Sequence, residues 1–256
     1  MKTLRPLAML LSAFALASCE KNAVQDITGS LPASQIRFFN FGVNAPTVNF
    51  YANDTKVTAT LSTTGAELTT GVASGGVGSS GYYAGLAPGN YNFSGRISAT
   101  VDKDLVIATV PFTLAEGKKY SLYISGIYDA AGKKAEGFVV EDPIPTEFDY
   151  TVMYLRFVNA IPNSPPLTLY FRNPTTGVET AVGAAVPYKS AGGFIPVPNG
   201  VYDVFTRTAG STAIQMLFTN ISLPSGRYGT IAARGDYTVT GTTAVTRPQL
   251  TYVVNR

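Results

Sequence analysis

The feature that most constrains how this chain can fold is an internal repeat. The segment IRFFNFGVNAP, which begins at Ile36, returns as LRFVNAIPNSP, which begins at Leu155, 119 residues later. Two further pairs of blocks match in the same order, residues 81–93 with 192–204 and residues 112–126 with 221–235. A repeat of this length indicates one structural unit that is copied along the chain, so we predict two tandem modules of about 115 residues each.

The residues of each copy indicate β-strands. Short runs rich in Val, Ile, Phe, Tyr and Thr are separated by clusters of Gly, Pro and Asn. Turn signals at intervals of about ten residues are typical of antiparallel sandwiches. Apolar residues recur at every second position in Val48 and Phe50, and in their counterparts Leu167 and Leu169. This is the period of a strand with one buried face, so we predict an all-β fold with two tandem antiparallel β-sandwich domains.

The expected domain boundaries follow from the repeat and from composition. The first sandwich is expected over residues 34–140 and the second over residues 151–256. Residues 141–150, which lie between them, contain two prolines and four acidic residues. We predict that this linker is extended and solvated, because proline cannot donate a hydrogen bond to a sheet.

The N-terminus has the layout of an export signal followed by a lipid attachment site. Lys2 and Arg5 precede a short apolar run, which falls below the roughly 20 residues that a membrane-spanning helix needs. The tetrapeptide Leu-Ala-Ser-Cys that ends at Cys19 resembles the bacterial lipobox. We therefore expect a signal peptide over residues 1–18, acyl chains on Cys19 that tether the protein to a membrane, and a flexible stalk over residues 19–33. The alternative is an ordinary secretory signal in which the cysteine is incidental.

Composition excludes several kinds of chemistry. Histidine is absent, and the single cysteine is the expected lipid attachment site. A Ser-His-Asp or Cys-His triad, a His-ligated zinc and a disulfide are therefore excluded. Two carboxylates could still act as a glycosidase pair, but Asp102 and Asp104, and likewise Glu141 and Asp142, are better interpreted as solvated turns. We predict no catalytic residue, no metal site and no cofactor, and keep a carboxylate hydrolase as the third alternative.

Charge is distributed unevenly between the two modules. Residues 20–150 contain 9 basic and 13 acidic residues, whereas residues 151–256 contain 8 basic and 3 acidic residues. After removal of residues 1–18 the chain carries 17 basic and 16 acidic residues, so no overall charge favours nucleic acid. The basic module could meet acidic polysaccharide or lipid phosphate, or successive molecules could associate head to tail. The other interpretation is that the charge difference between the modules arose by chance, because the numbers of charged residues are small.

Three residues are candidates for a ligand contact. Arg37 and Arg156 occupy the same position of the repeat and could form a repeated anion site, although the favoured interpretation is an outward-facing side chain on a strand. Tyr82 lies beside a glycine-rich loop and could stack on a sugar ring. Its neighbour Tyr83 aligns with Phe194, which suggests a core position that both modules share.

The matched blocks resemble the family of bacterial surface domains of unknown function numbered 4397. The resemblance lies in an R-x-x-N-x-x-x-x-x-P segment and a later P-x-G-x-Y segment. The first segment occurs as Arg37, Asn40 and Pro46, and again as Arg156, Asn159 and Pro165. In this later segment the second copy has Asn199 where the first copy has Pro88. The resemblance implies immunoglobulin- or transthyretin-like sandwiches, often in tandem on lipoproteins, and implies no catalytic residue.

These observations predict a membrane-tethered, non-catalytic cell-envelope lipoprotein that acts as a binding or scaffolding module, for glycans or other surface proteins. The expected location is the outer membrane. The sequence does not decide between its periplasmic face and its surface-exposed face. The alternative is a fimbria-like assembly subunit that polymerises by strand donation, with residues 248–256 as the lent strand.

Overall fold

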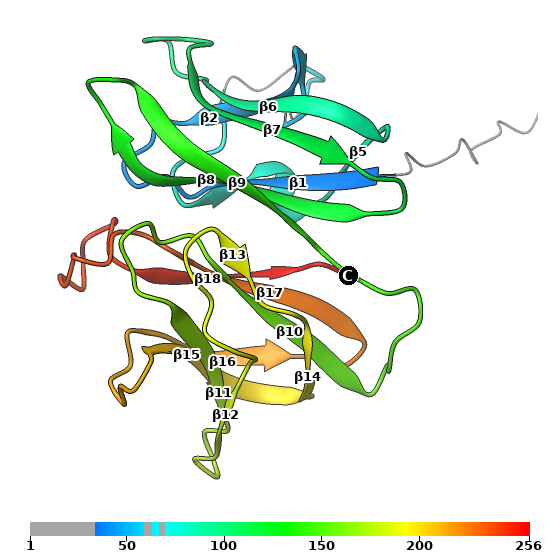
Figure 1. The fold of residues 1–256 in the computed structure, drawn as a ribbon, viewed down its shortest axis with the longest axis vertical. Coiled ribbons are helices and arrows are strands. Elements are labelled where there is room, and N and C mark those ends of the chain that lie inside the picture. The colour runs from blue at the N-terminus through cyan, green and yellow to red at the C-terminus, as the bar shows by residue number, and fades with distance from the viewer. Residues whose placement is uncertain (1–33, 59–62, 67–69) are drawn as a thin grey trace, which may run out of the picture. The chain divides into compact units, whose positions relative to one another are not determined.

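Each repeat folds into two β-sheets with the same strand order (Figure 1). The computed structural model describes residues 34–58, 63–66 and 70–256. The strands of the first repeat are β1 (Ser34–Asn40), β2 (Val48–Ala52), β3 (Thr55–Lys56), β4 (Gly76–Val77), β5 (Ala84–Leu86), β6 (Gly89–Ile97), β7 (Val106–Leu114), β8 (Lys119–Asp129) and β9 (Lys134–Glu141). Those of the second are β10 (Val152–Asn159), β11 (Leu167–Arg172), β12 (Glu179–Ala181), β13 (Ser190–Ala191), β14 (Ile195–Pro198), β15 (Gly200–Thr208), β16 (Met216–Leu223), β17 (Arg227–Arg234) and β18 (Gln249–Val254).

The sheet topology confirms the predicted all-β fold and adds one parallel pairing to each repeat. One sheet of the first repeat has the order β4-β1-β8-β9 with β5 also on β1, and the other has the order β3-β2-β6-β7. The second repeat reproduces these as β13-β10-β17-β18, with β14 on β10, and β12-β11-β15-β16. Strand β1 runs parallel to β8, and β10 runs parallel to β17, whereas the other strand pairs are antiparallel.

The expected signal peptide over residues 1–18, Cys19 and the stalk over residues 19–33 lie outside the described residues. Within the described part of the chain, no helix has the length and apolar character that crossing a membrane requires. The one helical element described there is a short 3-10 turn, η2 (Gly78–Gly81).

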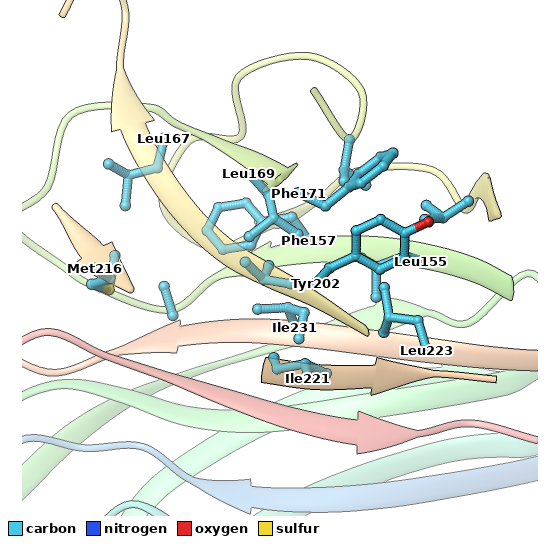
Figure 2. Packing of buried hydrophobic residues seen from close by; sticks show 14 of the residues in the cluster. Leu155, Phe157, Leu167, Leu169, Phe171, Tyr202, Met216, Ile221, Leu223 and Ile231 are labelled. Carbon is cyan, nitrogen blue, oxygen red and sulfur yellow. The ribbon is translucent and has the colours of Figure 1, made fainter. Parts of the chain in front are cut away.

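Each sandwich has its own apolar core, formed by alternate residues of the strands. In the second repeat, Leu155 and Phe157 from β10 pack with Leu167 and Leu169 from β11 and with Ile231 from β17 (Figure 2). The first repeat places Ile36 and Phe38 of β1 in the corresponding core. The period of two in the sequence therefore identifies the core-facing residues correctly.

The other face of β1 and β10 is also buried, because it lies in a third apolar cluster to which both repeats contribute. The cluster contains Phe39, Phe41, Tyr123 and Phe138 of the first repeat and Val158, Ala160 and Ala232 of the second. Strands buried on both faces have near-continuous apolar sequences, and this explains why IRFFNF is apolar at positions of both parities. The described residues form one compact unit.

The linker between the repeats is only partly as predicted. Pro143 and Pro145 are exposed, as expected, but Asp142 is 1% exposed. The interpretation of Asp142 as part of a solvated turn is therefore wrong, because its carboxylate is enclosed between the repeats. Asp102 and Asp104 do lie in an exposed turn, as predicted.

The segment proposed for strand donation is part of its own sheet. Within residues 248–256, β18 pairs antiparallel with β17 from the Gly229–Val254 pair to the Arg234–Gln249 pair. Lending this segment to another molecule would remove an edge strand from the second repeat.

Candidate functional site

Arg37 donates a hydrogen bond from the first repeat to the second. It lies on β1, is 0% exposed, and donates from Nε to Ser121 Oγ over 2.9 Å. Its Nη1 donates to the backbone carbonyl of Val254, at the end of β18, over 3.2 Å. The side chain therefore joins the first repeat to the last strand of the second.

Arg156 makes the reciprocal set of bonds. It lies on β10, is 0% exposed, and donates from Nε to Thr230 Oγ1 over 3.0 Å. Its Nη1 donates to the backbone carbonyl of Glu141, at the end of β9, over 2.7 Å. Each arginine thus reaches the last strand of the opposite repeat. The interpretation of Arg37 and Arg156 as outward-facing side chains is wrong, and burial also leaves neither of them a surface for a ligand from solvent.

Asp142 is the carboxylate that faces both arginines. Its Oδ1 accepts a charge-assisted hydrogen bond from Arg156 Nη2. Its Oδ2 accepts from Ser121 Oγ over 2.7 Å and from the Tyr83 hydroxyl over 2.5 Å, and lies 3.6 Å from Arg37 Nε. A buried charge is tolerated where it is both paired and hydrogen-bonded, and Asp142 meets both conditions.

The second repeat has Asn255 in the position that Asp142 occupies in the first. Asn255 follows β18 as Asp142 follows β9, and its Oδ1 accepts from Thr230 Oγ1 over 2.8 Å. Its Nδ2 donates to the Tyr83 hydroxyl over 3.1 Å. The buried cluster therefore holds two guanidinium groups and one carboxylate. Arg37 Nη2 has no hydrogen-bond partner within the described residues.

Tyr83 and Phe194 play the same role in the two repeats, as the alignment predicted, but they are half-buried and not core residues. Each ring stacks on the arginine of its own repeat, with the guanidinium carbon of Arg37 4.9 Å from the Tyr83 centroid and that of Arg156 4.7 Å from the Phe194 centroid. Burial raises the pKa of Tyr83 well above its ordinary value, and the charge of Asp142 raises it further. The Tyr83 hydroxyl therefore stays protonated and donates to the carboxylate.

An open groove of about 860 Å³ lies where the two repeats meet, beside this cluster. The first repeat contributes Val77, Ser80, Gly81, Tyr82 and Tyr83 to its lining, and the second contributes Pro224, Arg227, Tyr252, Val253, Val254, Asn255 and Arg256. Tyr82 is 77% exposed in the groove, which places this sequence-predicted ligand contact on an accessible surface.

The turn before Tyr82 has an unusual backbone. Ser79 and Ser80, inside η2, both have left-handed φ angles, +48° and +54°. Gly81 follows with φ +85°, and a Cβ there would lie 3.2 Å from Val253 of the second repeat. The glycine is required both by its φ and by this close approach, and it brings Tyr82 to the boundary between the repeats.

Some of the opposite charges of the two repeats form ion pairs with each other within the molecule. Lys189 of the second repeat pairs with Glu136 of the first over 2.9 Å, and the Tyr188 hydroxyl donates to the same carboxylate over 2.8 Å. Arg156 of the second repeat likewise forms an ion pair with Asp142, which follows the last strand of the first repeat. The basic repeat therefore meets the acidic repeat of its own chain. Arg227, in contrast, has no carboxylate within ion-pair distance in the part of the chain that the structure describes.

Comparison with known families identifies the first repeat. Residues 34–149 match the family model described as a domain of unknown function, DUF4397. The first repeat is thus similar to the DUF4397 family. The resemblance predicted from Arg37, Asn40 and Pro46 is thus confirmed over the first repeat, and a tandem arrangement of two DUF4397 domains on a lipoprotein stays a prediction. No curated protein gives a significant match to the chain.

Similar solved structures add no functional information. The TIE protein of Bacillus anthracis is matched with a TM-score of 0.24 and 14% identity, over 78% of this chain and 32% of that one. A leucine-rich repeat protein from Bacteroides thetaiotaomicron is matched with a TM-score of 0.17 and 12% identity, over 79% of this chain and 25% of that one. The chain thus spans about a third and a quarter of these proteins, and scores this low support no conclusion.

Several residues of the site were missed by the sequence analysis. Asp142 was assigned to the linker, and Asn255 and Arg227 were not singled out. One signal could have found Asp142, since an arginine repeated at the same position of an apolar strand requires a buried partner if both faces of that strand are covered. No local signal marks Arg227, because it enters the groove through the packing of one repeat on the other.

Proposed function

We propose that this protein is a lipid-anchored, non-catalytic module of the bacterial cell envelope that binds glycans in the groove between its two repeats. The observation that supports the groove is the exposed ring of Tyr82 in a concave, mainly apolar surface of about 860 Å³. Ligand sites are typically concave and mostly apolar, with few polar groups that fix orientation. An exposed tyrosine offers an apolar face to a sugar ring and a hydroxyl to its oxygen atoms.

The contact between the repeats supports a binding role and not a catalytic one. Asp142 is occupied by Arg156, Ser121 and Tyr83, and is closed off from solvent. A carboxylate that acts as a general acid or base must reach its substrate. The groove lining itself contains no aspartate or glutamate. We therefore assign the cluster to holding the repeats together, which keeps the groove preformed.

The binding role is tested with the purified mature protein on a glycan array and by equilibrium titration of the glycans it retains. Removal of the Tyr82 ring in Tyr82→Ala should weaken binding by about two- to tenfold, since an aromatic contact contributes about 0.5–1.5 kcal/mol. Tyr150→Ala is the matched control, because Tyr150 is 66% exposed but does not line the groove. Equal losses in the two variants, or no retention of any glycan, would refute the proposed function.

The anchor is tested separately in cells. The wild-type protein should fractionate with membranes and incorporate radiolabelled fatty acid, whereas Cys19→Ser should do neither. Protease treatment of intact cells then determines which face of the membrane carries the protein. Membrane association of Cys19→Ser at the wild-type level would contradict a lipid anchor.

A further inference from the structure

We propose that the groove selects acidic saccharides, with the sugar ring on Tyr82 and its anionic group at Arg227 and Arg256. This inference rests on the proposed function and names the chemical class of its ligand. A carboxylate, phosphate or sulfate on the sugar presents the same charged oxygen atoms, and the guanidinium group binds each of them with two parallel hydrogen bonds.

The first argument is the charge of the groove. Arg227 and Arg256 both line it and both are exposed. Of the six other cations of the second repeat, four have a carboxylate partner within the described residues, namely Arg156, Arg172, Lys189 and Arg207, and Arg234 and Arg247 have none. Arg227 has none within the described residues, and the lining includes no acidic side chain to oppose an anion. Complementary charge of this kind favours the encounter with an anion and its orientation.

The second argument is the charge beneath the groove. The buried cluster has one carboxylate for two guanidinium groups, so it carries an excess positive charge. Arg37 Nη1 donates to the carbonyl of Val254, and Val254 lines the groove. Buried charges act through a lower dielectric than exposed ones, so this excess raises the potential at the groove surface.

The third argument is the shape of the groove at Tyr82. Two successive non-glycine residues, Ser79 and Ser80, are held in the left-handed region, which costs about 1–2 kcal/mol for each. Strain of this kind persists where the surrounding structure imposes it and is concentrated at binding sites.

The test compares two probes that differ only in charge, an oligogalacturonate and its methyl ester, by isothermal titration with the full mature chain. The acid should bind about tenfold or more tightly than the ester, because a charge-assisted contact is lost on esterification. The acid's advantage should shrink as salt is raised, since both arginines are exposed to screening. Excess inorganic phosphate should compete only weakly, because it lacks the ring that Tyr82 holds.

Variants assign the selectivity to Arg227. Arg227→Gln should weaken binding of the acid about tenfold and leave binding of the ester unchanged. Lys103→Gln is the control for net charge, because it removes one positive charge as Arg227→Gln does, and Lys103 is exposed and lies outside the groove lining. Equal affinity for acid and ester, both dependent on Tyr82, would overturn the acidic class and leave glycan binding intact. Displacement of the acid by phosphate alone would indicate a simple anion site and also overturn the inference, and no binding of any glycan would refute the proposed function with it.

Discussion

The buried carboxylate of Asp142 provides the sharpest test of how the two repeats are held together. Asp142→Asn keeps the size of the side chain and removes its charge. In the native protein this carboxylate faces Arg156 and Arg37 and accepts hydrogen bonds from Ser121 and Tyr83. After the substitution two buried guanidinium groups remain with no anion. The amide also brings two donors into a cluster in which donors already exceed acceptors.

The expected cost follows from these contacts. Removal of one partner from a buried ion pair costs about 3–5 kcal/mol, because the remaining charge is left uncompensated. The amide oxygen still accepts one hydrogen bond, which favours the lower half of that range. Total stabilities of folded domains are about 5–15 kcal/mol, so the loss is a large fraction of the whole. At roughly 2–4 °C for each kcal/mol in a chain of this size, the thermal midpoint should fall by roughly 6–16 °C.

The assay is urea unfolding monitored by far-UV circular dichroism and by tyrosine fluorescence. Asp54→Asn is the matched control, since the Asp54 carboxylate also pairs with an arginine, Arg96 at 3.1 Å, but is 99% exposed; its midpoint should stay at the wild-type value. The triple variant Arg37→Met, Asp142→Leu, Arg156→Met removes all three charges and should recover most of the stability. A loss of less than about 1 kcal/mol in Asp142→Asn would refute the reasoning, because it would mean that the arginines do not depend on this carboxylate.

Three further predictions concern single side chains. Tyr123→Phe should be neutral or slightly stabilising in urea unfolding, because the Tyr123 hydroxyl is buried without a hydrogen-bond partner in the described residues. Burial raises the pKa of Tyr123 from 10.0 to about 12, so the stability that comes from its neutral form is complete below pH 10 and is lost as pH rises towards 12; the alkaline loss measured by thermal unfolding should be shallower in Tyr123→Phe. Gly81→Ala should cost more than Gly117→Ala, because both have left-handed φ but only at Gly81 does a new Cβ approach another side chain, Val253 at 3.2 Å; urea midpoints of the two variants measure the difference.

The strands and their core-facing residues could be predicted because the signals are local. Alternation at Val48 and Phe50, and turn glycines between short apolar runs, depend on neighbours in sequence alone. The repeat then extended the same assignment to the second module. What alternation cannot show is whether the second face of a strand meets water or another sheet. Arg37 was therefore interpreted as outward-facing, although Phe39 on the same face of β1, and Phe41 just after the strand, indicated burial.

The polar cluster could not be predicted because its members are distant in sequence and their roles depend on packing. Prolines next to Asp142 indicated a solvated linker, and they are indeed exposed. The carboxylate is buried all the same, because β9 ends against the second repeat and the next side chain enters the space between Arg37 and Arg156. The match of Tyr83 with Phe194 was visible in the alignment. Its purpose, stacking on an arginine in each repeat, was not.

The groove and the buried cluster depend on the same contact, which links stability to binding. Tyr83 and Asn255 take part in the cluster and also line the groove, so an arrangement that satisfies Asp142 also fixes the position of Tyr82 relative to Arg227. A single repeat would expose Arg37 and Phe39 and would contain only half of the groove. A ligand that touches both repeats should therefore stabilise their contact, by about 2.7 kcal/mol at a concentration of one hundred times its dissociation constant. The segment IRFFNF of the first repeat and its counterpart LRFVNA of the second each supply one side of that contact, which explains why the pattern occurs in both repeats.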